Sequence, residues 1–200
     1  MDKFQNKYRI PSARAAWWNY ENNAAYFITI CTAHREHFFG EIVGNKMNLS
    51  MVGVIADVLW HETKNHSDFM KSGAFVVMPN HIHAIVIIDK PDPPTNTLPP
   101  IVETLHATSL QQKSEQTKNE FMSVISPKPH SLSTIIRSYK SAVTKHAHRM
   151  GTDFTWQTRF HDHIIRDREE YQRIENYITT NPEKWEDDIF FKNEITIQKI

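Results

Sequence analysis

The chain has 200 residues, in which 23 lysines and arginines balance 23 aspartates and glutamates, and 40% of the residues are hydrophobic. These values predict one globular domain with a core of ordinary size. The single cysteine, Cys31, excludes an internal disulfide, which suits a reducing cytoplasm. The N-terminus is polar and no run of about 18 apolar residues occurs, so we expect neither a signal peptide nor a membrane span.

The first ninety residues predict a polar arm, several strands and one helix. The arm extends from residue 1 to about residue 23, and a strand follows over 25–32. Gly44-Asn45 is typical of a hairpin turn, which predicts a further pair of strands around it. Ser50 suits the start of a helix whose apolar face is formed by Val52, Ile55, Ala56, Leu59 and Trp60. Two more strands, over 73–78 and 81–89, are joined tightly at Pro79-Asn80.

The rest of the chain begins with a segment of unusual composition. Residues from about 91 to 129 contain seven of the ten prolines around a Ser-, Gln-, Lys- and Asn-rich centre, which predicts a mobile insertion. A helix over 131–150, a strand over 161–166 and a helix from Asp167 to Pro182 follow. This order predicts a single α+β domain, a ferredoxin-like sandwich with an antiparallel sheet and helices on one face.

Two histidines stand one residue apart in the strand over 81–89. Residues i and i+2 of a strand point to the same face, so His81 and His83 leave the sheet side by side while Ile82 points into the core. Two adjacent neutral imidazoles supply two ligands of a divalent-metal site, which then lacks only an oxygen or nitrogen ligand from elsewhere. A pair of surface histidines on a half-exposed strand is the alternative interpretation of so short a pattern.

The last predicted helix carries a second pair of functional side chains. Tyr177 and Asn181 are four residues apart, so they lie on one helical face. A tyrosine hydroxyl beside a metal-binding carboxamide suits covalent phosphoryl transfer, because the tyrosine can attack phosphorus while the metal polarises the phosphate oxygens. The alternative is a tyrosine in the buried stripe, followed by an asparagine at the helix C-terminus.

With these two elements, the chain resembles the REP-associated tyrosine transposases, which belong to the HUH single-strand endonucleases and are related to the single-tyrosine insertion-sequence transposases. The similarity covers nearly all of the chain outside the segment from about 90 to 130. Its motifs are Tyr8-Arg9-Ile10-Pro11-Ser12-Ala13-Arg14, Tyr26-Phe27-Ile28-Thr29-Ile30-Cys31-Thr32, Phe38-Phe39-Gly40-Glu41-Ile42, Met78-Pro79-Asn80-His81-Ile82-His83, Trp156-Gln157, Asp162-His163-Ile164-Ile165-Arg166 and Tyr177-Ile178-Thr179-Thr180-Asn181-Pro182.

The resemblance implies a HUH endonuclease fold and a particular chemistry. His81 and His83 are then paired ligands of Mg²⁺ or Mn²⁺, Asn181 is the third ligand, where the insertion-sequence relatives usually carry glutamine, and Tyr177 is the nucleophile. Attack by Tyr177 leaves a 5′-phosphotyrosine link and a free 3′-hydroxyl. The implied function is DNA transposition, by nicking and joining single-stranded DNA near a hairpin of a REP-type palindrome. By the same resemblance, the chain acts as a monomer.

Candidate DNA contacts come from cations and aromatic side chains. The predicted helix over 131–150 contains four lysines or arginines and no acid, which favours a phosphate-binding surface, although a solvated basic face is common in proteins that bind no nucleic acid. The candidate DNA-binding residues are Arg14, Arg137, Lys140, Lys145, Arg149, His163 and Arg166. The candidate stacking residues are Trp17, Trp18, Tyr26 and Trp156, of which we expect at least two to be buried.

Three rival sites are less suited to this chemistry. Tyr139 falls in the apolar stripe of its helix, so we expect it in the core. His146 and His148 are two apart on the same helix and do not face each other. His161 and His163 lie on a predicted strand and could hold a metal, and their segment supplies supporting structure or a DNA contact.

Two other functions stay open. One is a domesticated protein that binds DNA hairpins and cleaves them weakly or not at all, against which the intact set of His81, His83, Tyr177 and Asn181 argues. The other is a metal-dependent hydrolase that uses a metal-bound water at the histidine pair and His163, with Tyr177 structural. A covalent protein–DNA adduct distinguishes the two enzymes, because only a tyrosine nucleophile forms one.

Overall fold

The computed structural model describes residues 3–4, 7–8, 18–20, 22–91 and 130–191. The expected insertion from about 91 to 129 lies almost wholly outside these ranges, and Arg14 and Trp17 of the N-terminal arm lie outside them too. Of the arm, the structure describes two short strands, β1 (Lys3–Phe4) and β2 (Lys7–Tyr8). No helix in the described part of the chain is long and apolar enough to cross a bilayer.

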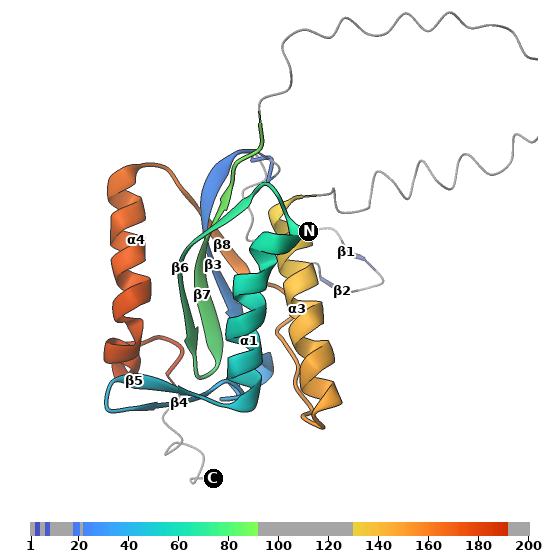
Figure 1. Ribbon diagram of the computed structural model, residues 1–200, viewed down its shortest axis with the longest axis vertical. Coiled ribbons are helices and arrows are strands. Elements are labelled where there is room, and N and C mark those ends of the chain that lie inside the picture. The colour runs from blue at the N-terminus through green and yellow to red at the C-terminus, as the bar shows by residue number, and fades with distance from the viewer. Residues whose placement is uncertain (1–2, 5–6, 9–17, 21, 92–129, 192–200) are drawn as a thin grey trace, which may run out of the picture.

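A four-stranded antiparallel sheet in the order β6-β7-β3-β8 forms the centre of the fold (Figure 1). Its strands are β3 (Ala24–Cys31), β6 (Met70–Met78), β7 (His81–Ile88) and β8 (His161–Ile165), each close to the range predicted from the sequence. The central strand β7 pairs on both sides, and His83 lies opposite Thr29 of β3 and Val76 of β6. The histidine pair therefore sits in one of the two inner strands of the sheet.

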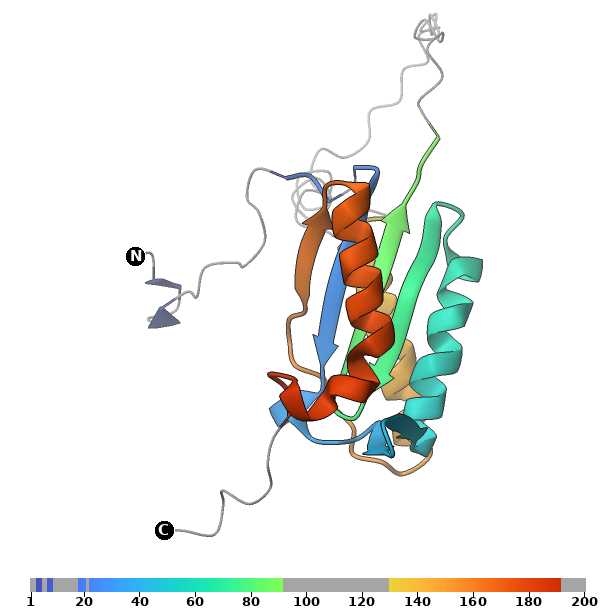
Figure 2. The same cartoon turned by 90° about the vertical axis from the view of Figure 1, so that its left-hand side faces the viewer.

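Helices cover both faces of this sheet (Figures 1 and 2). α1 (Met51–Glu62) and α3 (Leu132–Arg149) pack on one face, and α4 (Arg168–Thr180) packs on the other. The antiparallel α+β sandwich was expected, but the placement of all helices on one face was wrong. The reason is that β7 is apolar on both faces: Ile82 belongs to the core beneath α1 and α3, whereas Ile85 packs with Ile178 of α4.

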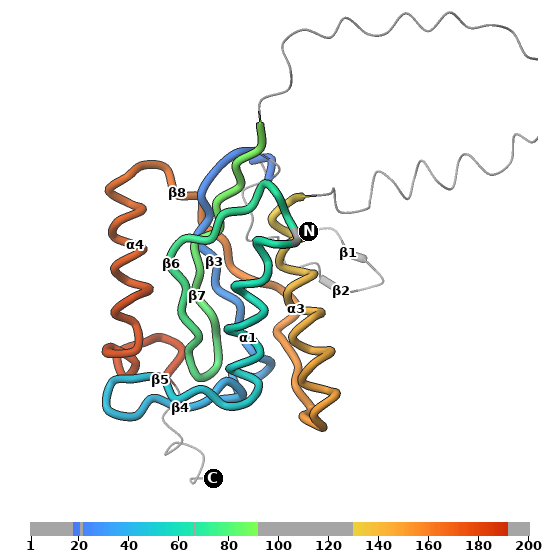
Figure 3. Tube along the Cα trace, in the orientation of Figure 1, coloured from blue at the N-terminus to red at the C-terminus, as the bar shows by residue number. Residues whose placement is uncertain are grey.

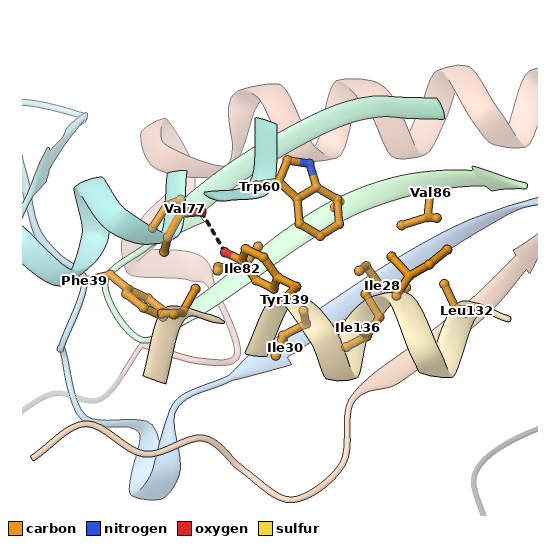
Figure 4. Close-up of a cluster of buried hydrophobic side chains, with 14 of the residues drawn as sticks. Ile28, Ile30, Phe39, Trp60, Val77, Ile82, Val86, Leu132, Ile136 and Tyr139 are labelled. Carbon is orange, nitrogen blue, oxygen red and sulfur yellow. Dashed lines mark hydrogen bonds between the residues drawn. The ribbon is translucent and has the colours of Figure 1, made fainter. Parts of the chain in front are cut away.

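The larger core lies between the sheet and the α1–α3 pair (Figure 4). Trp60 of α1 and Tyr139 of α3 are almost fully buried there and meet edge to face, with ring centroids 5.2 Å apart. The Tyr139 hydroxyl donates a hydrogen bond to the Ala56 carbonyl at 2.8 Å. The interpretation of Tyr139 as a core residue is therefore confirmed, and its hydroxyl is occupied.

Shorter elements complete the domain. The strands β4 (Gly40–Val43) and β5 (Lys46–Leu49) form the expected hairpin, and the Ser50 side chain caps α1 by accepting from the Gly53 N–H. Three 3₁₀ helices cover Ala33–Arg35, Thr63–His66 and Asn181–Asp187. After α4, the last of these turns the chain back towards the β6–β7 connection (Figure 3). This return brings the residues that follow α4 close to the histidine pair.

Candidate functional site

The two histidines of β7 face α4 and are buried. His81 and His83 are 0% and 1% exposed, and their Nε2 atoms lie 3.0 Å apart. The alternative of a half-exposed surface pair is therefore wrong. Burial, with the positive charge of Arg35 adding to it, lowers the pKa of His81 to about 3. Burial and the neighbouring His81 likewise hold the pKa of His83 well below its usual range. Both rings are neutral near pH 7 and can act as ligands.

The Asn80 side chain sets the orientation of His81. Its Nδ2 group donates to the backbone carbonyls of Arg35 and Phe190, at 3.2 and 2.9 Å, so its Oδ1 atom is the end that faces the ring. That oxygen lies 2.9 Å from His81 Nδ1 and can only accept, so the ring carries its proton on Nδ1. The lone pair of His81 Nε2 is therefore directed at His83.

Thr29 plays the corresponding part for His83. Its Oγ1 atom lies 2.9 Å from His83 Nδ1, and both groups are buried. A hydroxyl can donate or accept, so Thr29 suits either tautomer of this ring. When it accepts, the two Nε2 lone pairs point at the same space, and a cation between them satisfies both. Fixed partners on the outer nitrogens of histidines are typical of metal sites.

The third member of the site comes from α4. Asp167 caps this helix by accepting from the Glu170 N–H, and the buried Ile178 packs against the sheet. Tyr177 is 41% exposed, so it does not belong to the buried stripe, and its hydroxyl lies 3.1 Å from His83 Nε2. Burial of its inner part and the Asp188 carboxylate raise the pKa of Tyr177 to about 12, against the opposing effect of a hydrogen bond with Asn181.

Asn181 follows α4 directly and keeps helical backbone angles, so it lies one turn after Tyr177 on the same helical face, as expected. Its side chain is 2% exposed, and Nδ2 donates to Asp188 Oδ2 at 3.0 Å. Its Oδ1 atom is buried and has no hydrogen-bond partner among the described residues. A buried carboxamide oxygen without a partner is costly unless a ligand meets it.

These groups fit a divalent metal ion. Ligand atoms of His81, His83 and Asp188 all lie within 4.8 Å of one another, so these three residues could hold an ion. When two ligand atoms each lie about 2.1 Å from one metal ion and subtend a right angle at it, they are about 3.0 Å apart. The separation of the two Nε2 atoms is 3.0 Å. Imidazole nitrogens combined with amide or carboxylate oxygens form a mixed ligand set that suits Mn²⁺ at least as well as Mg²⁺.

Sequence reasoning missed three residues of this site. Asp188 lies eleven residues beyond Tyr177 in an acidic stretch, and only the turn after α4 brings its carboxylate to the histidines. Asn80 was assigned only to a turn, although an asparagine directly before His-x-His is a signal that the sequence contains. The structure shows that this asparagine is buried. Thr29 could have been found only from the register of β3 against β7, since it lies opposite His83.

His163, the rival metal ligand, contacts Glu170 and not the histidine pair. Its Nε2 atom lies 2.8 Å from Glu170 Oε1, and the second oxygen of Glu170 accepts from the Arg166 N–H at 2.9 Å. This network ties the end of β8 to the first turn of α4, which is a supporting role. A groove of about 400 Å³, lined by His161, His163 and Tyr177 among others, lies beside it. Arg166 is exposed at the end of β8.

The cations of α3 do not join this site. Arg137, Lys145 and Arg149 are exposed on a helix that packs on the opposite face of the sheet from the histidine pair (Figure 1). Lys140 is partly buried and donates to the Gln157 carbonyl at 2.6 Å. His148 contacts the Phe154 carbonyl and not a second histidine. The α3 cations and the Tyr177 site are thus two separate surfaces.

The candidate stacking residues are mostly structural. Tyr26 is 0% exposed, and its hydroxyl receives a hydrogen bond from Trp18 Nε1 at 3.0 Å. Trp156 is partly buried against Phe39 and Phe154, and its Nε1 donates to the Lys140 carbonyl at 3.1 Å. Of the candidate stacking residues that the structure describes, Tyr26 is buried as expected, whereas Trp18 and Trp156 are only partly buried.

Comparison with known proteins places the chain among relatives. It matches no family model. An uncharacterized protein of Haemophilus influenzae is 33% identical over 178 residues, which cover 88% of this chain and 90% of the relative. The two proteins belong to one family. A solved structure of a REP-associated tyrosine transposase bound to a REP hairpin is similar with a TM-score of 0.53 and 18% sequence identity, over 88% of this chain and 74% of that one.

The chain has the tyrosine-transposase fold. The fold expected from the sequence motifs is therefore confirmed. Within the tyrosine-transposase fold, the candidate residues of this chain occupy β7, the C-terminal end of α4 and the turn that follows it.

Proposed function

We propose that this chain is a metal-dependent single-stranded DNA endonuclease and strand transferase, which uses Tyr177 as its nucleophile near a DNA hairpin. The observation that carries the proposal is the juxtaposition of the Tyr177 hydroxyl with His83 Nε2 at 3.1 Å, in a site where His81 Nε2 lies a further 3.0 Å away. The tyrosine-transposase fold, and its similarity to a REP-associated tyrosine transposase that was solved bound to a REP hairpin, support the choice of DNA as substrate.

The proposed metal is Mg²⁺ or Mn²⁺, held by His81, His83 and the Oδ1 atom of Asn181. Such an ion supplies Lewis acidity, which stabilises the charge that develops on the phosphate oxygens and the leaving oxygen. The chain itself keeps the ligands neutral by burying both imidazoles, and it fixes their orientation through Asn80 and Thr29. No water-derived nucleophile or ATP is required.

Tyr177 performs the bond exchange. Its Oη forms a bond to phosphorus while the bond from phosphorus to the 3′-oxygen breaks. The phenolic proton leaves during attack, and the 3′-oxygen gains one, so the products are a 5′-phosphotyrosine and a free 3′-hydroxyl. Attack by a 3′-hydroxyl on the phosphotyrosine reverses these changes and joins strands. Tyr177 is 41% exposed and lines the groove between β8 and α4, so a DNA strand lying in that groove would contact this side chain.

A direct test is the trapping of the covalent intermediate. We expect an oligonucleotide that carries a hairpin, a single-stranded flank and a 3′ label to become covalently attached to the protein in Mn²⁺ or Mg²⁺. The adduct should resist denaturation and disappear in EDTA, in Tyr177→Phe and in His81→Ala or His83→Ala. Asn181→Ala should weaken the reaction, whereas Asn181→Gln should retain part of it. Full cleavage in EDTA would contradict the metal assignment.

The same experiment distinguishes the other two functions. A hydrolase would cleave without forming an adduct and would need His163, which contacts Glu170 in this structure. We therefore expect His163→Gln to keep both adduct formation and Mn²⁺ affinity. A domesticated binding protein would retain hairpin binding and show no adduct under any of these conditions.

A further inference from the structure

Asp188 is close enough to the two histidines to be a ligand itself, but the proposed set of His81, His83 and Asn181 gives it no role. It ends the 3₁₀ helix Asn181–Asp187, and its carboxylate lies within 4.8 Å of ligand atoms of both His81 and His83. Its two oxygens have different partners. Oδ2 accepts from Asn181 Nδ2 at 3.0 Å, and Oδ1 accepts from the Phe190 N–H at 2.7 Å. The carboxylate is therefore held in place by its own backbone turn.

A carboxamide has an ambiguity that an imidazole or a carboxylate lacks. Its oxygen can bind a metal ion, whereas its nitrogen carries two hydrogens and cannot. An asparagine ligand must therefore be held with the correct end towards the ion. In this chain, Asn181 Nδ2 donates to the carboxylate of Asp188, which can only accept. Asn181 Oδ1 is buried and has no partner among the described residues.

We propose that Asp188 is a positioning residue that fixes the side-chain amide of Asn181, so that its oxygen faces the metal ion held by His81 and His83. The inference rests on the proposed function, because it assumes that Asn181 is a ligand. Partners of this kind, outside the ligands themselves, typically change metal affinity by about 10- to 100-fold when they are removed. Asp188 thus supplies the orientation of a ligand, and its own carboxylate stays bonded to Asn181 and Phe190.

The test is a Mn²⁺ titration of the full chain, read from the electron paramagnetic resonance signal of the free ion. We expect Asp188→Ala to lower Mn²⁺ affinity about tenfold or more. The matched control is Asp187→Ala, which removes the neighbouring exposed carboxylate and should leave affinity unchanged. Asp188→Asn keeps an oxygen that can accept from Asn181, so it should lose less affinity than Asp188→Ala.

The decisive arm is the double variant Asn181→Asp with Asp188→Ala. A carboxylate at position 181 presents an oxygen whichever way it turns, so the double variant should bind Mn²⁺ within about threefold of the unaltered chain. If the double variant stays as weak as Asp188→Ala, Asp188 is itself a ligand and the positioning role is overturned. Unchanged affinity in Asp188→Ala, or equal losses in Asp188→Asn and Asp188→Ala, would overturn it as well.

The outcome for the unaltered chain separates this inference from the proposed function. A chain that binds Mn²⁺ normally but is insensitive to Asp188→Ala would refute only the positioning role. A chain that binds no Mn²⁺ would refute the metal site on which both depend. Thermal unfolding of each variant, measured alongside, identifies any loss of binding that comes from unfolding.

Discussion

The hydroxyl of Tyr177 lies 3.1 Å from Nε2 of His83 in the same chain. The proposed nucleophile thus contacts the proposed metal ligands of its own chain, and no second copy is needed to bring them together. The Asn181 and Asp188 side chains that follow α4 are joined at 3.0 Å, and Asn80 binds the Phe190 carbonyl at 2.9 Å. These contacts fix the segment after α4 against the body of its own domain.

The first prediction is that cleavage requires an intact site within one chain. We expect a mixture of inactive Tyr177→Phe and inactive His81→Ala protein to remain inactive in an adduct assay, because each chain lacks one component of its own site. A sedimentation measurement should show a monomer. Recovered cleavage in the mixture would mean that Tyr177 serves the histidines of a partner.

The second prediction compares two tyrosines that differ in surroundings. Tyr177→Phe removes the attacking oxygen and keeps the ring that packs on Phe27 at a centroid distance of 6.0 Å, so cleavage should vanish while hairpin binding and stability persist. Tyr139→Phe removes a buried hydroxyl that donates to the Ala56 carbonyl. This variant should lose about 1 kcal/mol of stability and keep its cleavage rate. Urea unfolding and adduct formation measure the two effects, and the reverse pattern would identify Tyr139 as the nucleophile.

Much of the fold could be predicted because its signals are local. The hairpin at Gly44-Asn45, the Ser50 cap and the strand β7 each depend on a few neighbouring residues, and each is found where expected. The placement of α4 could not be predicted in this way. Whether a helix covers one face of a sheet or the other depends on which strand residues are left uncovered, and here Ile85 and Ile165 both needed a partner.

Some residues of the site could likewise be predicted from local sequence patterns, and others could not. His81, His83, Tyr177 and Asn181 follow short spacing rules within one strand and one helix, so sequence patterns identify them. Asp188 reaches the site only because the chain reverses after α4, and Thr29 reaches it only through the pairing of β3 with β7. No spacing rule within a single element relates these residues to the histidines. Contacts of this type need the tertiary structure.

The third prediction concerns the exposed cations of α3. Arg137→Ala combined with Lys145→Ala should weaken DNA binding at low salt and reduce the slope of log affinity against log salt by about 2, because about two phosphate contacts are lost. Cleavage of a saturating short oligonucleotide should be unchanged, since α3 lies on the opposite face of the sheet from Tyr177. Lys46→Ala in the β4–β5 hairpin is the matched control. An unchanged salt slope would show that α3 does not contact DNA.

The last prediction follows from the burial of the histidine pair as neutral rings. Burial, with the positive charge of Arg35 adding to it, lowers the pKa of His81 to about 3 from 6.5, and the pKa of His83 is also lowered. Below pH 6.5 the unfolded chain takes up protons that the folded chain does not, so the free energy of unfolding must fall as pH decreases towards 3.

The size of this pH dependence can be estimated, and one variant serves as its control. Each histidine can contribute up to about 1.4 kcal/mol per pH unit within this window. His81→Asn removes the titrating ring while an amide can still donate to Asn80 Oδ1, so urea unfolding of this variant in EDTA should depend less steeply on pH between 6.5 and 4. Carboxylates contribute equally to both proteins and cancel in the comparison. Parallel pH profiles for the two proteins would mean that His81 is protonated in the folded chain, and the interpretation of the pair as neutral metal ligands would then be wrong.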